Sequence, residues 1–243
     1  MKLLGKLTAL SVLLTAMSCA LYAKDDEKRS DELKRIDSAA TVLEEIMGAP
    51  DKGIPKDVME SAKCVAVVPS MIKGGFIVGA RYGKGVATCR TSNGWSAPAP
   101  ISIAGGSWGL QFGGEAVDLV MLIMNDRGME HLLSSKFKLG AEGSVAAGPV
   151  GRQAEATTDW KMKSEVLSYS RSRGVFAGLE LNGAVVKQDD DSTRILYGKE
   201  VPFKEILTGQ VPPPEGSQHF LATVRKYSAE ARQERGAVEP PKN

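Results

Sequence analysis

Histidine and cysteine are scarce in this chain of 243 residues. The only two histidines are His131 and His219, and the three cysteines include no C-x-x-C pair. Zinc sites are built from clusters of such side chains, so the sequence predicts no metal site. The acidic run Asp189–Asp191 lacks the glycine and the distal glutamate of an EF-hand calcium loop. We therefore predict neither a metal nor a cofactor.

The chain also lacks a membrane span at its N-terminus. The apolar run at residues 7–17 is too short to cross a bilayer, and it stands between two lysines and a group of small residues. This pattern is typical of a secretory signal peptide over residues 1–20. Three outcomes stay open: cleavage after Ala20, cleavage after Ala23, and a lipoprotein cut before Cys19. We expect a secreted or periplasmic protein, with a lipid anchor on Cys19 as the alternative.

An excess of charge of either sign is missing from the mature protein. The formal charge of +2 comes from two lysines in residues 1–23; 31 basic groups less these two leave 29, which face 29 acidic groups. A neutral protein has no general attraction for nucleic acid, so we expect no nucleic-acid partner. Any binding of anions has to come from a local cluster of basic side chains.

Glycine, by contrast, is abundant and concentrated in one stretch. Eleven of the 26 glycines lie between Gly74 and Gly114, inside a segment from Cys64 to Met124 where short apolar runs alternate with turn signals. The pattern predicts strands near 64–68, 75–81, 86–91, 95–103, 108–113 and 117–124. Glycine inside strands marks bends and close backbone approach. We predict an α+β fold with a strongly bent, mainly antiparallel sheet, open or closed like a barrel.

Helical patterns flank this sheet at both ends of the chain. The charged run 24–37 leads into a helix at 31–47, whose apolar residues repeat at spacings of three and four. Other helices are expected at 54–62, 128–135, 191–197, 202–208 and 217–233, and other strands at 164–170 and 173–187. We predict a single domain over residues 25–233 and a disordered tail at 234–243.

Two Asn-Gly pairs predict tight hairpins, at Asn93-Gly94 and at Asn182-Gly183. The second pair has the clearer pattern, because strand-like sequence lies on both sides of it.

Cys64 and Cys89 are an even pair once Cys19 has been removed or lipidated. Each falls in an expected strand, and a secreted protein meets an oxidising environment. Two interpretations stay open at this point: a disulfide between the two cysteines, or two small buried thiols.

Two glycine motifs resemble loops of enzymes. Gly105 to Gly109 matches the G-x-S-x-G nucleophile elbow with Ser107 as nucleophile, but the elbow needs a helix after the serine and LQFGGEAV has a strand pattern. Its histidine would have to be His219. Gly79 to Gly85 has the wrong spacing for a phosphate loop and lacks its Ser or Thr, so we interpret it as a hairpin turn. A serine hydrolase is thus the weakest alternative, and we predict no enzyme.

Two groups of basic side chains are candidates for binding anionic lipid headgroups. One lies along the first predicted helix and consists of Lys28, Arg29, Lys34 and Arg35. The other lies near expected turns and consists of Lys73, Arg81, Lys84 and Arg152. Acidic residues are as frequent as basic ones along that helix, which weakens the case for lipid binding by the first group. The second forms a cationic patch beside Trp95 and Tyr82 only if the turns gather at one end of the sheet.

Several short sequence motifs follow one another along the chain. They are Pro69-Ser70-x-x-Lys73-x-Gly75-Phe76, Gly79-x-Arg81-Tyr82-Gly83-x-Gly85, Trp95-Ser96-Ala97-Pro98, Ala147-Gly148-Pro149-x-Gly151-Arg152 and Tyr169-Ser170-x-Ser172-x-Gly174-x-Phe176-Ala177-Gly178. Together they resemble the SYLF domain family over roughly residues 30–210. The resemblance implies a lipid-binding domain without enzymatic activity. Eukaryotic members bind phosphoinositides through a basic amphipathic N-terminal helix, and some bind actin filaments.

A secreted bacterial-type member would meet neither actin nor phosphoinositides. The resemblance then implies an anionic envelope lipid, such as phosphatidylglycerol or cardiolipin. In this chain the matching helix, 31–47, departs from the family by being as acidic as it is basic. We expect a non-enzymatic lipid-binding protein of the cell envelope, associated with the membrane surface. The alternative is a structural or partner-binding envelope protein without a lipid ligand.

Overall fold

The computed structural model describes residues 2–49, 53–75, 78–108, 114–149, 164–172, 175–178 and 181–238. Its helices are α1 (Lys2–Met47), α2 (Lys56–Ser61), α3 (Asp126–Leu133), α5 (Asp190–Tyr197), α6 (Phe203–Leu207) and α7 (Gln218–Val238). Its strands are β1 (Cys64–Gly75), β2 (Val78–Thr91), β3 (Gly94–Trp95), β4 (Ala99–Trp108), β5 (Gly114–Ile123), β6 (Lys136–Lys138), β7 (Val145–Ala147), β8 (Val166–Ser172), β9 (Val175–Gly178) and β10 (Val185–Gln188).

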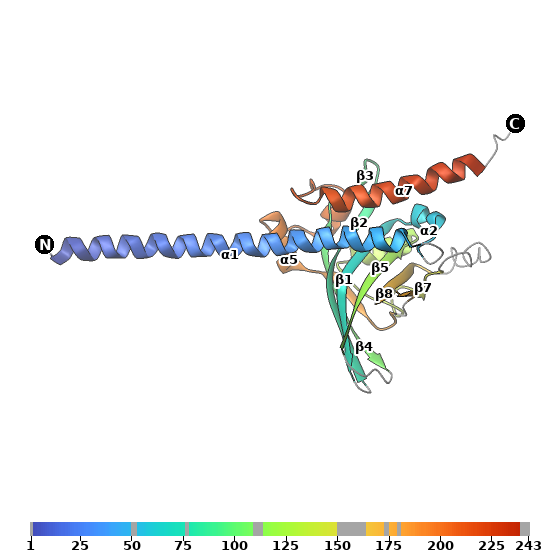
Figure 1. Cartoon of the computed structure of the whole chain (residues 1–243), viewed down its shortest axis with the longest axis horizontal. Coiled ribbons are helices and arrows are strands. Elements are labelled where there is room, and N and C mark those ends of the chain that lie inside the picture. The colour runs from blue at the N-terminus through green and yellow to red at the C-terminus, as the bar shows by residue number, and fades with distance from the viewer. Residues whose placement is uncertain are drawn as a thin grey trace.

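The strands form one sheet that curls into a half-barrel (Figure 1). Its main path runs β6-β10-β4-β2-β1-β5-β8-β7, with β3 paired to β2 and β9 paired to β8. Among the described pairs of strands only β7 with β8 is parallel, and an isolated bridge between Leu139 and Gly143 is parallel as well. The predicted α+β class, with a bent and mainly antiparallel sheet and helices at both chain ends, is therefore confirmed.

Both faces of the sheet are covered, because alternate residues of each strand point to opposite sides. On one side, residues such as Val65 and Val67 pack against α1, α2 and α7 through Leu43, Val58 and Phe220. On the other side, residues of the same strands pack against α3 and α6. In Figure 1, α1 and α7 lie side by side across the first of these faces.

The helix α1 is much longer than the predicted helix at 31–47. It spans 46 residues and includes the predicted signal segment and its cleavage sites. Over residues 25–47, where the side chains of the helix are described, the buried residues run from Glu32 and Ile36 to Ile46. Across the described residues, no helix combines the length and the apolar character needed to cross a membrane. At the other end of the chain, α7 continues to Val238 and so includes the first residues of the predicted tail.

The strands β1 and β2 run through positions where the sequence predicted turns. The interpretation of Gly79 to Gly85 as a hairpin turn is wrong, because these residues pair with β1 on one side and β4 on the other. The glycines allow close packing instead. A Cβ on Gly85 would lie 2.0 Å from the carbonyl oxygen of Val67, and one on Gly83 would lie 2.6 Å from Cγ1 of Val68.

The structure contains one of the two predicted hairpins and lacks the other. Asn93-Gly94 does lie in a tight turn, where β2 pairs with β3 and Gly94 has a φ of 116°. Asn182-Gly183 is also a turn, but the predicted hairpin around it is wrong. The strand before it, β9, pairs with β8, whereas the strand after it, β10, pairs with β4 and β6. Longer-range pairings thus override the local signal.

Cys64 and Cys89 lie directly opposite each other in the antiparallel register of β1 and β2. Their Sγ atoms are joined in a disulfide, and both residues are fully buried. Of the two interpretations left open by the sequence, the structure has the bonded one. The bond holds the two central strands in this register at the end next to α2. At the same end, the Arg90 amide donates a backbone hydrogen bond to the carbonyl oxygen of Lys63.

Candidate functional site

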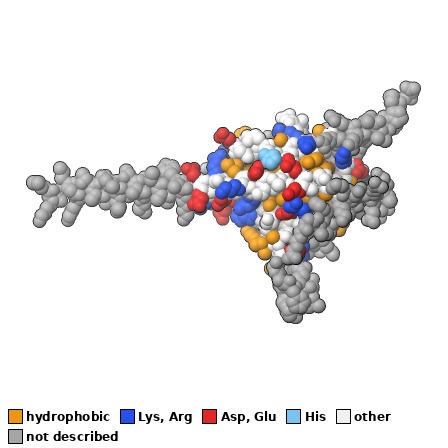
Figure 2. Space-filling model, in the orientation of Figure 1, with side chains coloured by type: hydrophobic (Ala, Val, Ile, Leu, Met, Phe, Trp, Pro, Cys, Tyr) orange, Lys and Arg blue, Asp and Glu red, His pale blue; other side chains and the backbone are white. Residues whose placement is uncertain are grey.

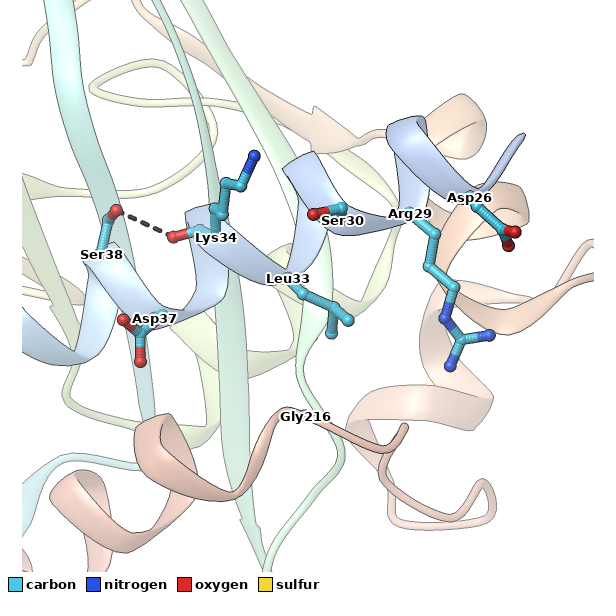
Figure 3. Close-up of a pocket in the computed structure, with 8 residues that line it drawn as sticks. All are labelled: Asp26, Arg29, Ser30, Leu33, Lys34, Asp37, Ser38 and Gly216. Atoms are coloured by element: carbon cyan, nitrogen blue, oxygen red, sulfur yellow. Dashed lines mark hydrogen bonds between the residues drawn. The ribbon is translucent and has the colours of Figure 1, made fainter. Parts of the chain in front are cut away.

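An open groove of about 700 Å³ runs beside the exposed part of α1, next to the segment before α7. It is lined by Asp26, Arg29, Ser30, Leu33, Lys34, Asp37, Ser38 and Gly216. Figure 3 shows Arg29, Leu33 and Asp37 pointing from α1 toward the segment that carries Gly216. They share this side of the helix because residues at spacings of four lie one above another.

Gly216 brings the preceding segment close to the helix. Its φ of 89° favours glycine, and a Cβ there would lie 3.1 Å from Cδ2 of Leu33. The groove is therefore shaped by a contact between residues far apart in the sequence, and its apolar floor is Leu33.

Arg29 is the groove residue best placed to meet an anion. Its side chain is half-buried, and among the described residues it has neither a hydrogen bond nor an ion pair. A guanidinium presents five N–H donors, which match the oxygens of a phosphate. Ser30 and Ser38 add hydroxyl groups to the lining of the same groove.

Two exposed cations of α1, Lys28 and Lys34, already have carboxylate neighbours. Lys28 lies 3.9 Å from Asp25, and Lys34 lies 3.2 Å from Asp31. Exposed pairs of this kind contribute about 0–1 kcal/mol. Lys34 can therefore exchange its carboxylate for another anion at little cost.

Arg35 and Lys84 serve a different purpose, because both belong to a network that joins α1, α5 and β2. Arg35 pairs with Glu32, which accepts a hydrogen bond of 2.9 Å from the hydroxyl of Ser192. Lys84 donates to the same hydroxyl at 3.3 Å and pairs with Asp189 at 2.6 Å. Two of the predicted lipid-binding cations are thus neutralised inside the protein.

Asp189 is both the partner of Lys84 and the N-cap of α5, where it accepts a hydrogen bond of 3.1 Å from the Ser192 amide. Burial alone would raise the pKa of this carboxyl, but the hydrogen bonds from Lys84 and Ser192 outweigh it and lower the pKa. Asp189 is therefore ionised at neutral pH, which explains the close pairing with Lys84.

Lys73 and Arg81 lie opposite each other on β1 and β2, with Glu115 of β5 on the other side of Lys73. Burial lowers the pKa of Lys73; Glu115 opposes this shift and Arg81 adds to it. Arg81 is largely buried and donates a hydrogen bond of 3.0 Å to the carbonyl oxygen of Gly106. These two cations face the same side of the sheet and are held apart from α1.

The opposite side of the sheet at this level exposes two large apolar side chains. Ile72 is 62% exposed and Tyr82 is 50% exposed, and they are direct partners across β1 and β2. Cross-strand partners have neighbouring side chains on one face. Figure 2 shows hydrophobic side chains at the surface next to the lower part of the molecule that is drawn in grey.

The predicted patch beside Trp95 and Tyr82 does not form, because these two aromatic residues lie near opposite ends of β2. Trp95 is buried, donates a hydrogen bond of 3.2 Å to Ser228 of α7 and has the guanidinium of Arg90 over its ring. Arg152 lies outside the described residues.

The serine hydrolase hypothesis gains nothing from the structure. Ser107 lies inside β4, where it pairs with Gly79 of β2, and the next described residue after β4 begins β5. Both ring nitrogens of His219 contact carboxylates of α1, Asp37 at 2.6 Å and Glu44 at 3.3 Å. The histidine that the predicted triad would use therefore has other partners.

Sequence reasoning missed the groove, although it named two of its cations. The missing residues are Ser30, Asp37, Ser38 and Gly216, which have no motif of their own. Asp37 carries one local signal: it stands four residues after Leu33 and eight after Arg29, so helical spacing alone places the three on one side.

Comparison with known proteins links the chain to one family. The family model described as Ysc84, a Las17-binding protein actin regulator, matches residues 104–227. The match begins in β4, so α1 lies outside it, whereas Gly216 on the other side of the groove lies within it.

Similarity to individual proteins reaches further along the chain. SH3 domain-containing YSC84-like protein 1 of Rattus norvegicus is 36% identical over 84% of this chain and 66% of its own length, and that of Homo sapiens is 34% identical over 78% and 57%. LAS seventeen-binding protein 3 of Saccharomyces cerevisiae (strain YJM789) is 35% identical over 70% and 38%. The chain thus spans two thirds or less of the length of these relatives.

None of these names refers to an enzyme, which agrees with the prediction of a non-enzymatic protein. The order of the sequence motifs, the curled sheet and the matched residues agree with one another. The chain belongs to the Ysc84 family, the family of the SYLF domain.

Proposed function

We propose that this protein is a non-enzymatic lipid-binding protein of the cell envelope, and that its α1 groove recognises anionic phospholipid headgroups. The observation that carries the proposal is Arg29: a half-buried guanidinium without an ion partner among the described residues, set in an open groove. A headgroup phosphate supplies the acceptors that this side chain lacks.

The groove matches a headgroup in composition as well as in charge. Ser30 offers a hydroxyl for the phosphate. Lys34 adds a second cation at the edge of the groove, on the other side of α1 from Arg29, beside Ser38, whose hydroxyl donates to the Lys34 carbonyl oxygen at 2.8 Å (Figure 3). Leu33 provides an apolar floor for the first carbons beyond the headgroup. The mature chain has no net charge, so binding depends on this local arrangement and weakens with salt.

A second contact with the membrane is the part of β1 and β2 that carries Ile72 and Tyr82. Ile72 and Tyr82 form an exposed apolar pair there, and a tyrosine combines an apolar ring with a polar tip that suits the boundary between headgroups and acyl chains. Lys73, on the other side of the strands, adds a partly exposed cation beside Glu115. We therefore propose a mixed contact surface, with the helix as its main part.

Residues 1–20 fit a signal peptide, so we place the protein in the periplasm or outside the cell. A lipid anchor on Cys19 is the alternative arrangement, and it would hold α1 at the membrane. In both cases phosphatidylglycerol and cardiolipin are the anionic lipids that the groove would meet.

The second candidate function is partner binding without lipid. It is favoured by the names of the relatives, since the yeast protein is named for binding LAS seventeen. The exposed pair Ile72 and Tyr82 would then contact a protein instead of a bilayer.

Vesicle binding of the mature protein separates the two. We expect residues 24–243 to sediment with vesicles that contain phosphatidylglycerol and to remain in solution with phosphatidylcholine alone. One basic side chain near an anionic surface contributes about 1 kcal/mol, so Arg29→Gln should weaken binding about fivefold.

Lys204→Gln is the matched control, because it removes the same charge from an exposed position of α6, on the other face of the sheet. Equal binding by both variants would show that the groove is not the contact. Absence of wild-type binding to vesicles of any composition would move the partner-binding function into first place.

A further inference from the structure

His219 joins α7 to α1 through two carboxylates at once. Its Nδ1 lies 2.6 Å from Oδ1 of Asp37, and its Nε2 lies 3.3 Å from Oε1 of Glu44. Carboxylates accept hydrogen bonds, so each contact needs a proton on the facing ring nitrogen. A neutral imidazole carries one such proton and an imidazolium carries two. The geometry therefore fits the charged form of His219.

Asp37 connects this contact to the lipid groove, because its side chain also lines the groove. The ionisable groups of the lining are Arg29, Lys34, Asp26 and Asp37. When His219 is charged, it neutralises Asp37 and the lining has one cation in excess. When His219 is neutral, the two cations and the two carboxylates balance.

We propose that protonation of His219 controls the ligand preference of the α1 groove, which binds anionic headgroups tightly in the protonated state and loses this preference when the proton leaves. The inference rests on the proposed function and adds its regulation by pH. It assigns a role to three residues, Asp37, Glu44 and His219.

The groups around the imidazole favour the proton. The hydrogen bond with Asp37 raises the pKa of His219 above its usual value of 6.5; burial works against this shift, and Glu44 adds to it. Within α7, the hydroxyl of Thr223 donates to the same oxygen of Glu44 at 3.1 Å. The other helix packed on α7 is α2, whose charged residues are Lys56, Asp57 and Glu60.

The direction of the effect follows from the raised pKa. His219 stays protonated at pH values above the ordinary pKa of histidine. It loses the proton when the pH rises through the raised pKa that it has in the folded protein. The charge of the groove then falls by one. One charge near an anionic surface changes binding about fivefold, so that is the loss we expect on crossing the titration.

The test measures binding of the mature protein to phosphatidylglycerol vesicles from about pH 6 to about pH 9, a range that brackets the ordinary pKa of histidine. Wild type should lose about fivefold in affinity across this range. His219→Gln should bind equally at all values, at the weaker level. His131→Gln is the matched control, because it removes the other histidine, and it should keep the pH dependence of wild type.

Asp37→Asn removes the groove carboxylate that His219 neutralises. Its binding should be tighter than that of wild type at the alkaline end of the range, and its remaining pH dependence should move to lower pH together with the titration of His219. In nuclear magnetic resonance titrations the same change should lower the pKa of His219. Wild-type binding that does not change with pH, or a pH dependence that persists in His219→Gln, would overturn the regulation and leave lipid binding intact. Failure of every variant to bind vesicles would overturn the proposed function itself.

Discussion

Loss of the disulfide between Cys64 and Cys89 should weaken the whole fold. The two cysteines are 25 residues apart in the sequence, and a cross-link over a loop of this length removes chain entropy from the unfolded state. The loop-closure expression gives about 3.5 kcal/mol at 25 °C for that separation. For a domain of this size the same amount corresponds to a fall in Tm of about 7–14 °C.

Urea unfolding of residues 24–243, with and without reductant, measures this contribution directly. Reduced wild type keeps both sulfur atoms in the core, so its loss reports the cross-link alone. The Cys64→Ala/Cys89→Ala variant also loses the packing of two fully buried side chains, and it should be at least as unstable. Its transition should not respond to reductant, which makes it the control for effects of reductant on other groups.

Two results would refute this reasoning. One is a transition midpoint of oxidised wild type that equals that of the reduced protein. The other is two reactive thiols per chain after denaturation without reductant, because a bonded pair has none.

Two further substitutions test other parts of the structure. Gly85→Ala should destabilise the protein by about 3 kcal/mol in urea unfolding, because its Cβ would meet the Val67 carbonyl oxygen at 2.0 Å. Gly74→Ala, which has no atom within 4 Å of its Cβ, is the control and should change stability by less than about 0.5 kcal/mol. Equal stabilities of the two variants would contradict the close contact between Gly85 of β2 and Val67 of β1. Ile72→Ser with Tyr82→Ser should leave the urea transition in place, since both side chains are exposed, and should reduce vesicle binding; unchanged binding would confine the membrane contact to α1.

Much of the fold could be predicted because its signals are local. The apolar repeat of residues 31–47 and the short apolar runs of the centre depend on neighbours in sequence, and both elements are present. The glycines at 79–85 could not be interpreted in the same way. A glycine in a turn and a glycine beside an irregularity of the paired strand look alike in sequence, and only the contacts of Gly83 and Gly85 with Val67 and Val68 distinguish them.

The candidate site was harder to predict, because its parts come together only in the fold. Charge counting found Arg29 and Lys34 but also Arg35 and Lys84, whose partners Glu32 and Asp189 neutralise them. The pairing of Asp37 with His219 joins residues 182 positions apart, and no spacing rule reaches that far. Helical periodicity places a side chain on a face; it does not say what covers that face.

The length of α1 has a mechanical consequence. A lipid anchor on Cys19, the alternative arrangement proposed above, would place about 20 Å of helix between the membrane and Glu32, which is the first buried residue among those of α1 whose side chains are described. Glu32 is also where Arg35 and Ser192 meet α1, next to Lys84 of the sheet. A pull from the membrane on this segment would reach the joint of α1, α5 and β2 at Glu32.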